Sequence, residues 1–189
     1  MRIIAGRHRG TKLAQPAGAD TRPTGDRVRE SLFNILEGGR FGDVLAGAII
    51  IDAFAGTGAL GLEALSRGGI YTTFIERDQA ALSVLRANIA RLDRTKDSRI
   101  IAGDAMSVTS WKGMPASLMF ADAPYGSGDG LATAVRLANI GALASGALII
   151  LETEKSEQPD PDQMAAGGLS PVDDRRYGRA RLHFLQVAG

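Results

Sequence analysis

An acidic residue, a small residue, a proline and an aromatic residue follow one another at Asp122, Ala123, Pro124 and Tyr125. The set suits chemistry on an exocyclic amine of guanine or adenine, whose nitrogen is a poor nucleophile because its lone pair is delocalised into the ring. The Asp122 carboxylate and the Ala123 carbonyl, held extended by the proline that follows it, can accept both N–H hydrogens and direct the lone pair at a methyl donor. Tyr125 can stack on the base. The alternative is a plain turn that leaves a strand.

Glycines at Gly56, Gly58 and Gly61 form a Gly-x-Gly-x-x-Gly pattern after an apolar run. At a strand-to-helix turn, glycine lets the backbone approach a ligand closely. Glu76 follows at about 20 residues, the spacing at which an acid accepts hydrogen bonds from a ribose diol. The pattern predicts a nucleoside-binding loop, against the alternative of a tight turn that only packs a helix on a sheet.

Asp52, just before this loop, discriminates between two cofactors. In a partly dry site, a carboxylate would repel a pyrophosphate such as that of NAD. It would attract a cofactor that carries an ammonium and a sulfonium, so the sequence favours S-adenosylmethionine. Asp104, after a further apolar segment, can hold the adenine amino group or, equally, cap the next helix.

An open α/β sheet can bring these residues together. Apolar runs predict strands at residues 48–54, 71–76, 99–102, 118–122 and 147–152. Helical periodicity predicts helices at residues 26–37, 59–67, 79–92 and 131–143. This alternation implies a Rossmann-like, doubly wound and mostly parallel sheet, in which ligands bind at the carboxyl ends of the strands. Segments at residues 170–177 and 181–187 predict an antiparallel C-terminal hairpin that completes seven strands.

The composition excludes several kinds of chemistry. The 189 residues include no cysteine, which excludes disulfides, cysteine metal sites and a thiolate nucleophile. His8 and His183 lie near opposite ends of the chain, so we expect no catalytic metal. We also expect no signal peptide and no membrane span, which favours a cytoplasmic protein.

Residues 122–125 resemble the Asp/Asn-Pro-Pro-Tyr motif of amino-methyltransferases, with Ala123 where that motif has its first proline. Residues 52–58 resemble the cofactor loop of the same enzymes. The resemblance implies cofactor contacts from Phe54 and Thr57 in the loop and from Ala105 beside Asp104.

Residues 1–6 and 21–36 are similar to the RsmD family, which are bacterial 16S ribosomal RNA guanine-N2 methyltransferases. The resemblance covers nearly the whole chain. It implies a class I methyltransferase fold, S-adenosylmethionine as cofactor, and a methyl transfer to the exocyclic N2 of a guanine in 16S rRNA.

The N-terminal segment is basic, and the family resemblance implies that it faces RNA. We predict a basic arm or hairpin at residues 1–24 and a methyltransferase domain at residues 25–189. Cationic side chains of this segment can contact phosphates with salt-sensitive affinity. The candidates are Arg7, Arg9, Lys12, Arg22, Arg27 and Arg29. Arginines of the C-terminal hairpin can extend this surface, although neighbouring aspartates offset them.

A base inside a duplex cannot reach a cofactor pocket, so the target is expected in a loop or as a flipped nucleotide. We expect the partner to be 16S rRNA within the assembling or assembled small ribosomal subunit, and the protein to act as a monomer. Other functions stay open at this point. The same tetrapeptide can serve methylation of adenine N6 in DNA or of a protein glutamine, the glycine loop can serve an NAD-dependent oxidoreductase, and a non-catalytic RNA-binding assembly factor can retain the cofactor pocket.

Overall fold

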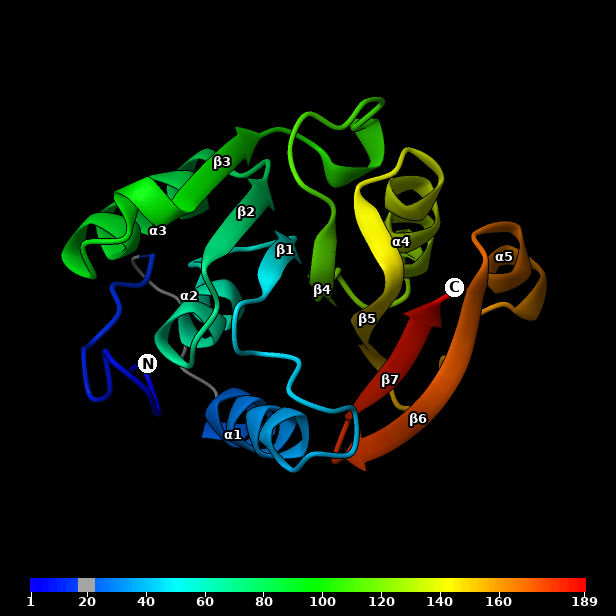
Figure 1. Ribbon diagram of the computed structural model, residues 1–189. Helices are drawn as coiled ribbons and strands as arrows, with labels where there is room; N and C mark the ends of the chain where they lie inside the picture. Colours follow the sequence, from blue (N-terminus) through cyan, green and yellow to red (C-terminus); the bar gives the residue numbers. More distant parts are fainter. Residues whose placement is uncertain (17–22) are drawn as a thin grey trace.

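The computed structural model describes residues 1–16 and 23–189. A seven-stranded sheet of order β3-β2-β1-β4-β5-β7-β6 forms its centre (Figure 1). The strands are β1 (Ile49–Ala53), β2 (Tyr71–Glu76), β3 (Ser98–Ala102), β4 (Ala116–Ala121), β5 (Leu143–Glu154), β6 (Leu169–Tyr177) and β7 (Ala180–Val187). All pairings are parallel except those that β7 makes with β5 and β6. The predicted mostly parallel sheet with an antiparallel C-terminal hairpin is confirmed.

Helices cover both faces of the sheet. The helices are α1 (Pro23–Glu37), α2 (Ala59–Ser66), α3 (Gln79–Arg91), α4 (Asp129–Asn139) and α5 (Pro161–Ala166), with short 3-10 helices η1 (Thr95–Asp97) and η2 (Ala105–Ser107). Successive side chains of β1 point to opposite faces, so Ile50 packs against α1 and α2 whereas Ile51 packs against α4. Within the described residues, no helix is both long and apolar enough to cross a membrane.

One predicted helix extended too far, and another helix was missed. The fourth predicted helix was expected to reach residue 143, but α4 ends at Asn139, and Gly141 turns the chain with φ of 72° into β5. Continuous apolar residues across this turn hide it from a periodicity analysis. Helix α5 was not predicted. Its N-terminus is defined by Pro161 in the first turn and by the Asp160 side chain, which accepts the amide of Asp162.

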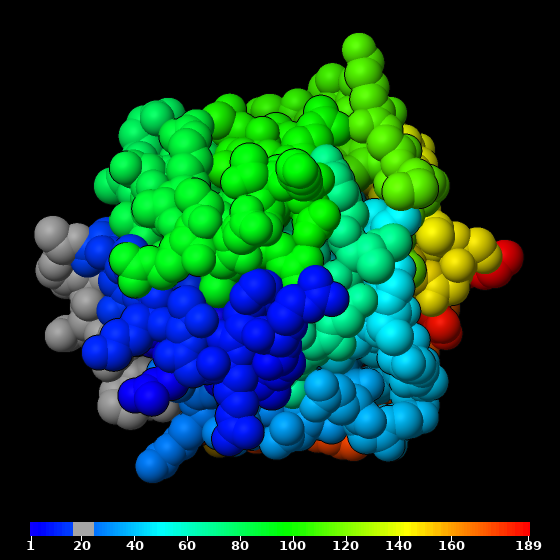
Figure 2. Space-filling model, turned by 60° about the vertical axis from the view of Figure 1, so that its left-hand side comes forward, coloured from blue at the N-terminus to red at the C-terminus, as the bar shows by residue number. Residues whose placement is uncertain are grey.

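Residues 1–16 form a small hairpin that joins the hydrophobic core. Arg2 pairs with Lys12 in antiparallel fashion, and Ile3 and Leu13 pack with α2 and α3. The fully buried Glu63 carboxylate accepts the amides of residues 4 and 5 at 2.8 and 3.0 Å. Figure 2 shows this hairpin (blue) directly against the green surface that follows β2. The structure shows a hairpin within residues 1–16 of the segment predicted as an arm or hairpin. The division into an arm at residues 1–24 and a domain at residues 25–189 stays a prediction.

The order of the sheet places β1 beside β4, with Ala53 paired to Ala121. The chain runs from β1 toward β2 and β3 on one side, and from β4 toward β5 on the other. This is a topological switch point, where the loops after the two strands separate and leave a crevice for a ligand. The glycine loop follows β1 and residues 122–125 follow β4, so the fold brings both predicted sites to one crevice.

Candidate active site

The Asp52 carboxylate binds the end of the glycine loop. Asp52 is 1% exposed, and its Oδ2 accepts the Gly61 amide at 2.8 Å. A Cβ at Gly61 would lie 3.0 Å from that oxygen and 2.5 Å from the Phe74 ring. Glycine is therefore required here for packing of α2 on the sheet, whether or not a ligand is bound.

Glu76, at the end of β2, also binds the glycine loop through its carboxylate. Its Oε2 accepts the Gly56 amide at 2.7 Å, and its Oε1 accepts the amides of Arg77 and Asp78 at 2.8 Å each. Phe54, at the start of the loop, has φ of 63°, a strained value for a bulky residue. Such strain is common at ligand sites, where the surrounding structure holds it in place.

These hydrogen bonds bear on the nature of the cofactor. A pyrophosphate site needs free backbone amides at the glycine turn. Here the amides of Gly56 and Gly61 already donate to Glu76 and Asp52, and the Gly58 amide donates to the Ala55 carbonyl. These three amides are therefore not free for a pyrophosphate, and the Glu76 carboxylate lines the pocket beside them.

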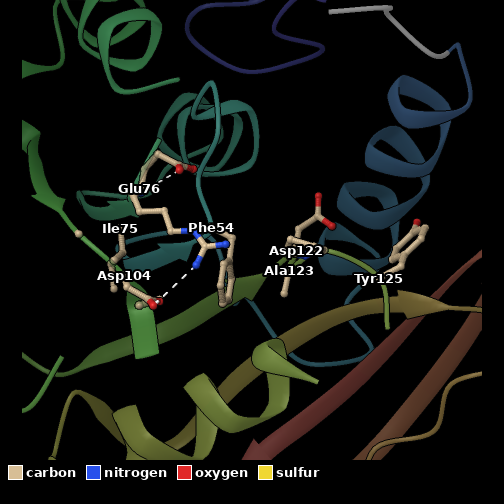
Figure 3. A pocket seen from close by; sticks show the side chains of 11 residues that line it. Phe54, Ile75, Glu76, Asp104, Asp122, Ala123 and Tyr125 are labelled. Carbon is tan, nitrogen blue, oxygen red and sulfur yellow. Dashed lines mark hydrogen bonds and ion pairs between the residues drawn. The ribbon is translucent and has the colours of Figure 1, made fainter. Parts of the chain in front are cut away.

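A pocket of about 390 Å³ opens between the loop and residues 122–125. Its lining comprises Phe54, Ile75, Glu76, Arg77, Gly103, Asp104, Ala105, Asp122, Ala123, Pro124 and Tyr125. Figure 3 shows Phe54 between two groups, with Ile75, Glu76 and Asp104 on one side and Asp122, Ala123 and Tyr125 on the other. The volume and the mixture of apolar and acidic walls are typical of small-ligand sites.

Asp104 caps a helix, as one of its two predicted roles requires, and it also lines the pocket. Its Oδ1 accepts the Met106 amide at 3.0 Å and caps η2, while its Oδ2 lies in the pocket 3.7 Å from the Arg77 guanidinium. The cap fixes the carboxylate at the pocket wall, so the structural role supports the proposed ligand contact.

The predicted cofactor residues fall into two groups. The side chains of Phe54, Glu76, Asp104 and Ala105 line the pocket, whereas Gly56, Thr57 and Gly58 shape the loop beside it. A Cβ at Gly58 would lie 2.4 Å from Leu85, and the Thr57 carbonyl accepts the Asn88 amide at 3.0 Å.

Asp52 departs from the prediction of direct cofactor contact. Its carboxylate lies beneath the loop and is bonded to the Gly61 amide, so it acts on the pocket through its charge and through the loop.

A second cavity, of about 820 Å³, meets the first at residues 122–125. It lies between the N-terminal hairpin, α1, α2 and the β6–β7 turn, and it shares Asp122 and Tyr125 with the first pocket. Two ligands placed in these cavities would meet at the Asp122 carboxylate, as a cofactor and a substrate must.

Carboxylates concentrate at this junction. Asp122 is open to water inside the cavity but surrounded by protein, and this burial, followed by the charge of Glu152, raises its pKa to about 7. Burial raises the pKa of Asp52 to about 8, despite the hydrogen bond from Gly61, and it raises the pKa of Glu152 as well. Among the ion pairs of the described residues, none involves these three groups. The site therefore favours ligands that bring positive charge or N–H donors.

Sequence reasoning missed two acids at this site. Glu152, near the end of β5, accepts the Tyr125 hydroxyl at 2.7 Å, which fixes the orientation of the aromatic ring. Glu157 accepts the Gly126 amide at 2.9 Å and holds the turn after the tetrapeptide. Glu152 had a detectable signal, because like Glu76 it is an acid at the carboxyl end of a parallel strand.

Four of the six residues predicted to contact RNA are exposed. Exposed positions on the hairpin and on α1 are Arg7, Arg9, Lys12 and Arg27. Arg22 lies outside the described residues.

Arg29 departs from its predicted role. Its guanidinium is 6% exposed, donates to the Arg2 carbonyl at 2.7 Å and lies 3.4 Å from Asp26. It joins α1 to the hairpin beside the second cavity and is too buried to follow a phosphate backbone. Arg91 on α3, which the sequence analysis did not select, is exposed beside the hairpin and donates to the Lys12 carbonyl at 3.1 Å.

Comparison with known proteins agrees with this geometry. The family model described as "Conserved hypothetical protein 95", which covers RsmD proteins, matches residues 1–186. The chain belongs to the RsmD family.

Within this family, the chain is 44% identical to "Ribosomal RNA small subunit methyltransferase D" of Escherichia coli over 154 residues, which are 82% of this chain and 75% of that protein. It is 28% identical to the protein of the same name from Buchnera aphidicola, over 82% of this chain and 78% of that one. Among solved structures, "Putative methyltransferase yhhF" of Escherichia coli superposes with a TM-score of 0.82 at 37% identity, covering 100% of this chain and 98% of that one. The class I methyltransferase fold predicted for this family is confirmed.

Proposed function

We propose that this protein transfers a methyl group from S-adenosylmethionine to the exocyclic N2 of a guanine in 16S rRNA of the small ribosomal subunit. The observation that carries the proposal is the meeting of two cavities at Asp122, directly at the β1–β4 switch point. The family relationship, with the name of the Escherichia coli relative, supports the choice of ribosomal RNA as substrate. The reaction would take place in the cytoplasm.

The residues of the first pocket fit S-adenosylmethionine. Phe54, Ile75 and Ala105 offer apolar contacts to an adenine, and Glu76 and Asp104 offer acceptors to a ribose and an amino group. Each carboxylate oxygen has two lone pairs. Oε1 of Glu76 already accepts two amides and Oε2 accepts one, so Oε2 can accept one further hydrogen bond from a ribose hydroxyl. Burial raises the pKa values of Asp52 and Asp122 in the free protein. The ammonium and the sulfonium of the cofactor would favour the ionised form of both carboxyl groups. When bound, the cofactor supplies a methyl group activated by the sulfonium.

The protein's own contribution is alignment of the amine. Asp122 would accept one N–H of the amino group and the Ala123 carbonyl the other, so that the nitrogen lone pair points out of the plane of the base. Tyr125, which is 41% exposed in the crevice, would stack on the base. Alignment of this kind can contribute up to about 7–11 kcal/mol. A strong base is unnecessary, because the Asp122 carboxylate can take the proton that the methylated nitrogen releases.

RNA would approach over the basic N-terminal hairpin. Arg7, Arg9 and Lys12 are exposed there, and Arg91 extends the same basic region. Such contacts position a backbone without reading its sequence. The particle that presents the guanine would supply the remaining selectivity, and the enzyme would act on it as a monomer.

One transfer assay tests the proposal. Free 16S rRNA and assembled small subunits, both from a strain that lacks the gene, are incubated with the protein and tritiated S-adenosylmethionine, and the nucleosides are then analysed. N2-methylguanosine is the expected product. N6-methyladenosine, or methyl label in ribosomal protein alone, would refute the guanine assignment. Tight NAD binding without S-adenosylmethionine binding, measured by calorimetry, would refute the cofactor.

A variant separates the enzyme from a non-catalytic assembly factor. Asp122→Ala removes the carboxylate acceptor, and turnover should fall by about 100-fold or more, as for removal of a group aimed at the transition state. RNA binding should persist. Asp162→Asn, at an exposed carboxylate on α5, is the matched control. Full biological function of the Asp122→Ala protein, despite absent methylation, would support the assembly-factor interpretation instead.

A further inference from the structure

Glu152 lines the same cavity as Asp122, where the base of the substrate would bind. It lies on β5, the strand paired with β4, and it lines the second cavity together with Asp122 and Tyr125. Its Oε1 accepts the Tyr125 hydroxyl at 2.7 Å. Within the described part of the chain, the Glu152 carboxylate accepts no other hydrogen bond. Its Oε2 and one lone pair of Oε1 therefore remain for a ligand.

The two carboxylates form a pair of acceptors at one edge of the cavity. The charge of Glu152 contributes to the raised pKa of Asp122, after burial, and burial also raises the pKa of Glu152. Two carboxylates whose charges interact in this way repel each other when both are ionised. A ligand with two adjacent N–H donors would relieve the repulsion and satisfy both groups.

Candidate amine substrates differ in what lies beside the amino group. Guanine presents the N2 amino group next to N1–H, which is a second donor on the same Watson–Crick edge. Adenine presents its N6 amino group next to an unprotonated N1, and a glutamine amide presents its nitrogen next to a carbonyl oxygen. A second carboxylate beside the amine acceptor therefore attracts guanine and repels the other two.

We propose that Glu152 selects guanine by accepting a hydrogen bond from N1–H, while Asp122 and the Ala123 carbonyl hold the amino group. This inference rests on the proposed guanine-N2 transfer. Tyr125 acts on both parts of the site, because its ring lies against the base and its hydroxyl orients the Glu152 carboxylate. Sites built to bind a substrate N–H reject analogues that lack it, since the buried acceptor is then left without a partner.

The test uses purines that keep the 2-amino group but carry a lone pair in place of N1–H. The methylated guanine is first located by mapping the tritium label to RNA fragments. Small subunits are then reconstituted around 16S rRNA in which this guanine is replaced by 2-aminopurine or 2,6-diaminopurine. Guanine and analogue particles are mixed, and mass spectrometry of the nucleosides gives the ratio of their kcat/KM values. Wild-type protein should prefer guanine by at least about 100-fold.

Glu152→Gln should reduce this preference by at least about 10-fold, because the glutamine amide can rotate and donate to an unprotonated N1. Glu152→Asp keeps the charge and should retain more of the preference than Glu152→Gln. Glu154→Gln removes the same charge two residues along β5 and should leave the ratio at the wild-type value. Thermal melts confirm that each variant is folded.

The outcomes separate the inference from the function on which it rests. If the wild type leaves natural guanine unmethylated, the proposed function fails. If guanine is methylated but the wild type accepts 2-aminopurine equally well, the role of Glu152 is overturned and the methyl transfer stands. The same conclusion follows if folded Glu152→Gln discriminates as strongly as the wild type.

Discussion

Asn88 on α3 connects the N-terminal hairpin with the glycine loop. The side chain is fully buried. Its Oδ1 accepts the Ala14 amide at 2.7 Å, and its Nδ2 donates to the Ala14 carbonyl at 3.1 Å and to the Thr57 carbonyl at 3.0 Å. One amide group therefore holds the segment that would meet RNA and the loop that would meet the cofactor, so Asn88→Ala should affect both stability and cofactor affinity.

The loss of stability expected for Asn88→Ala follows from the backbone groups that lose their hydrogen-bond partner. Three backbone groups lose their hydrogen bonds, and each lost bond costs about 1 kcal/mol, for a total destabilisation of about 3 kcal/mol. In a chain of this size each kcal/mol lowers the melting temperature by about 2–4 °C, so the expected decrease is about 6–12 °C. Release of the Thr57 carbonyl should also weaken S-adenosylmethionine binding by about 5-fold, which corresponds to about 1 kcal/mol.

Scanning calorimetry and titration calorimetry measure the two effects. Asn34→Ala, at an exposed position of α1, is the control and should change neither value. Asn88→Asp should retain the bond from the Ala14 amide but place a carboxylate oxygen against two carbonyls. A melting temperature of Asn88→Ala within about 2 °C of the wild type would refute the hydrogen-bond argument. A large decrease in melting temperature with unchanged cofactor affinity would refute the connection between hairpin and loop.

Four further outcomes are expected. The kcat/KM for the rRNA substrate should rise as pH increases through about 7, because the raised pKa of Asp122 leaves its acceptor protonated below that value; a flat profile from pH 6 to 8 contradicts this. Asp52 has a folded pKa of about 8, above its unfolded value, so wild-type stability should decrease from about pH 4 to 8. Between these pH values, the stability of Asp52→Asn relative to the wild type should thus increase with pH, by at most about 1.4 kcal/mol per pH unit in urea titrations. A difference in stability that stays constant with pH would exclude the buried-carboxyl explanation. Gly61→Ala should cost about 1–3 kcal/mol in the same titrations, because its Cβ would lie 2.5 Å from Phe74, and unchanged stability would show that the helix can move away. Replacing Arg7 and Arg9 by alanine should lower the slope of log K against log salt for RNA binding by about 1 per residue, whereas an unchanged slope would place RNA elsewhere.

The sequence predicted the elements whose patterns are local and unbroken. Strand β2 was predicted with the residues that the structure shows, because its apolar run begins after two glycines and ends at Glu76. The extent of β5 was underestimated, since Ser145 and Gly146 interrupt its pattern although β5 runs from Leu143 to Glu154. Leu143 pairs with β4 before the interruption and Leu148 pairs with it afterwards, across a shift of register. Such long-range pairing is invisible in a local window.

For the site, the sequence predicted which residues lie at the pocket better than it predicted which groups each side chain contacts. The positions of Phe54 and Asp104 at the pocket follow from their place after parallel strands. The burial of Arg29 does not follow from its charge, although its position on α1 beside Val28 and Leu32 offered a signal, because both belong to the apolar face. A charged residue on such a face commonly extends its stem along the core and satisfies its head group with a carbonyl.

The arrangement of acids explains why the loop and the tetrapeptide act as one site. Beside burial, the charge of Asp122 raises the pKa of Asp52 across the β1–β4 pair, and the charge of Glu152 on β5 raises the pKa of Asp122. Without a ligand, these groups destabilise the folded state as they ionise, which a purely structural site would not retain. A cationic cofactor on one side and a base with two N–H donors on the other would each remove part of that cost. Occupation of one cavity should thereby favour ionisation of Asp122, the form that the other ligand requires, so the same charges that weaken the free protein would make the two ligands bind cooperatively.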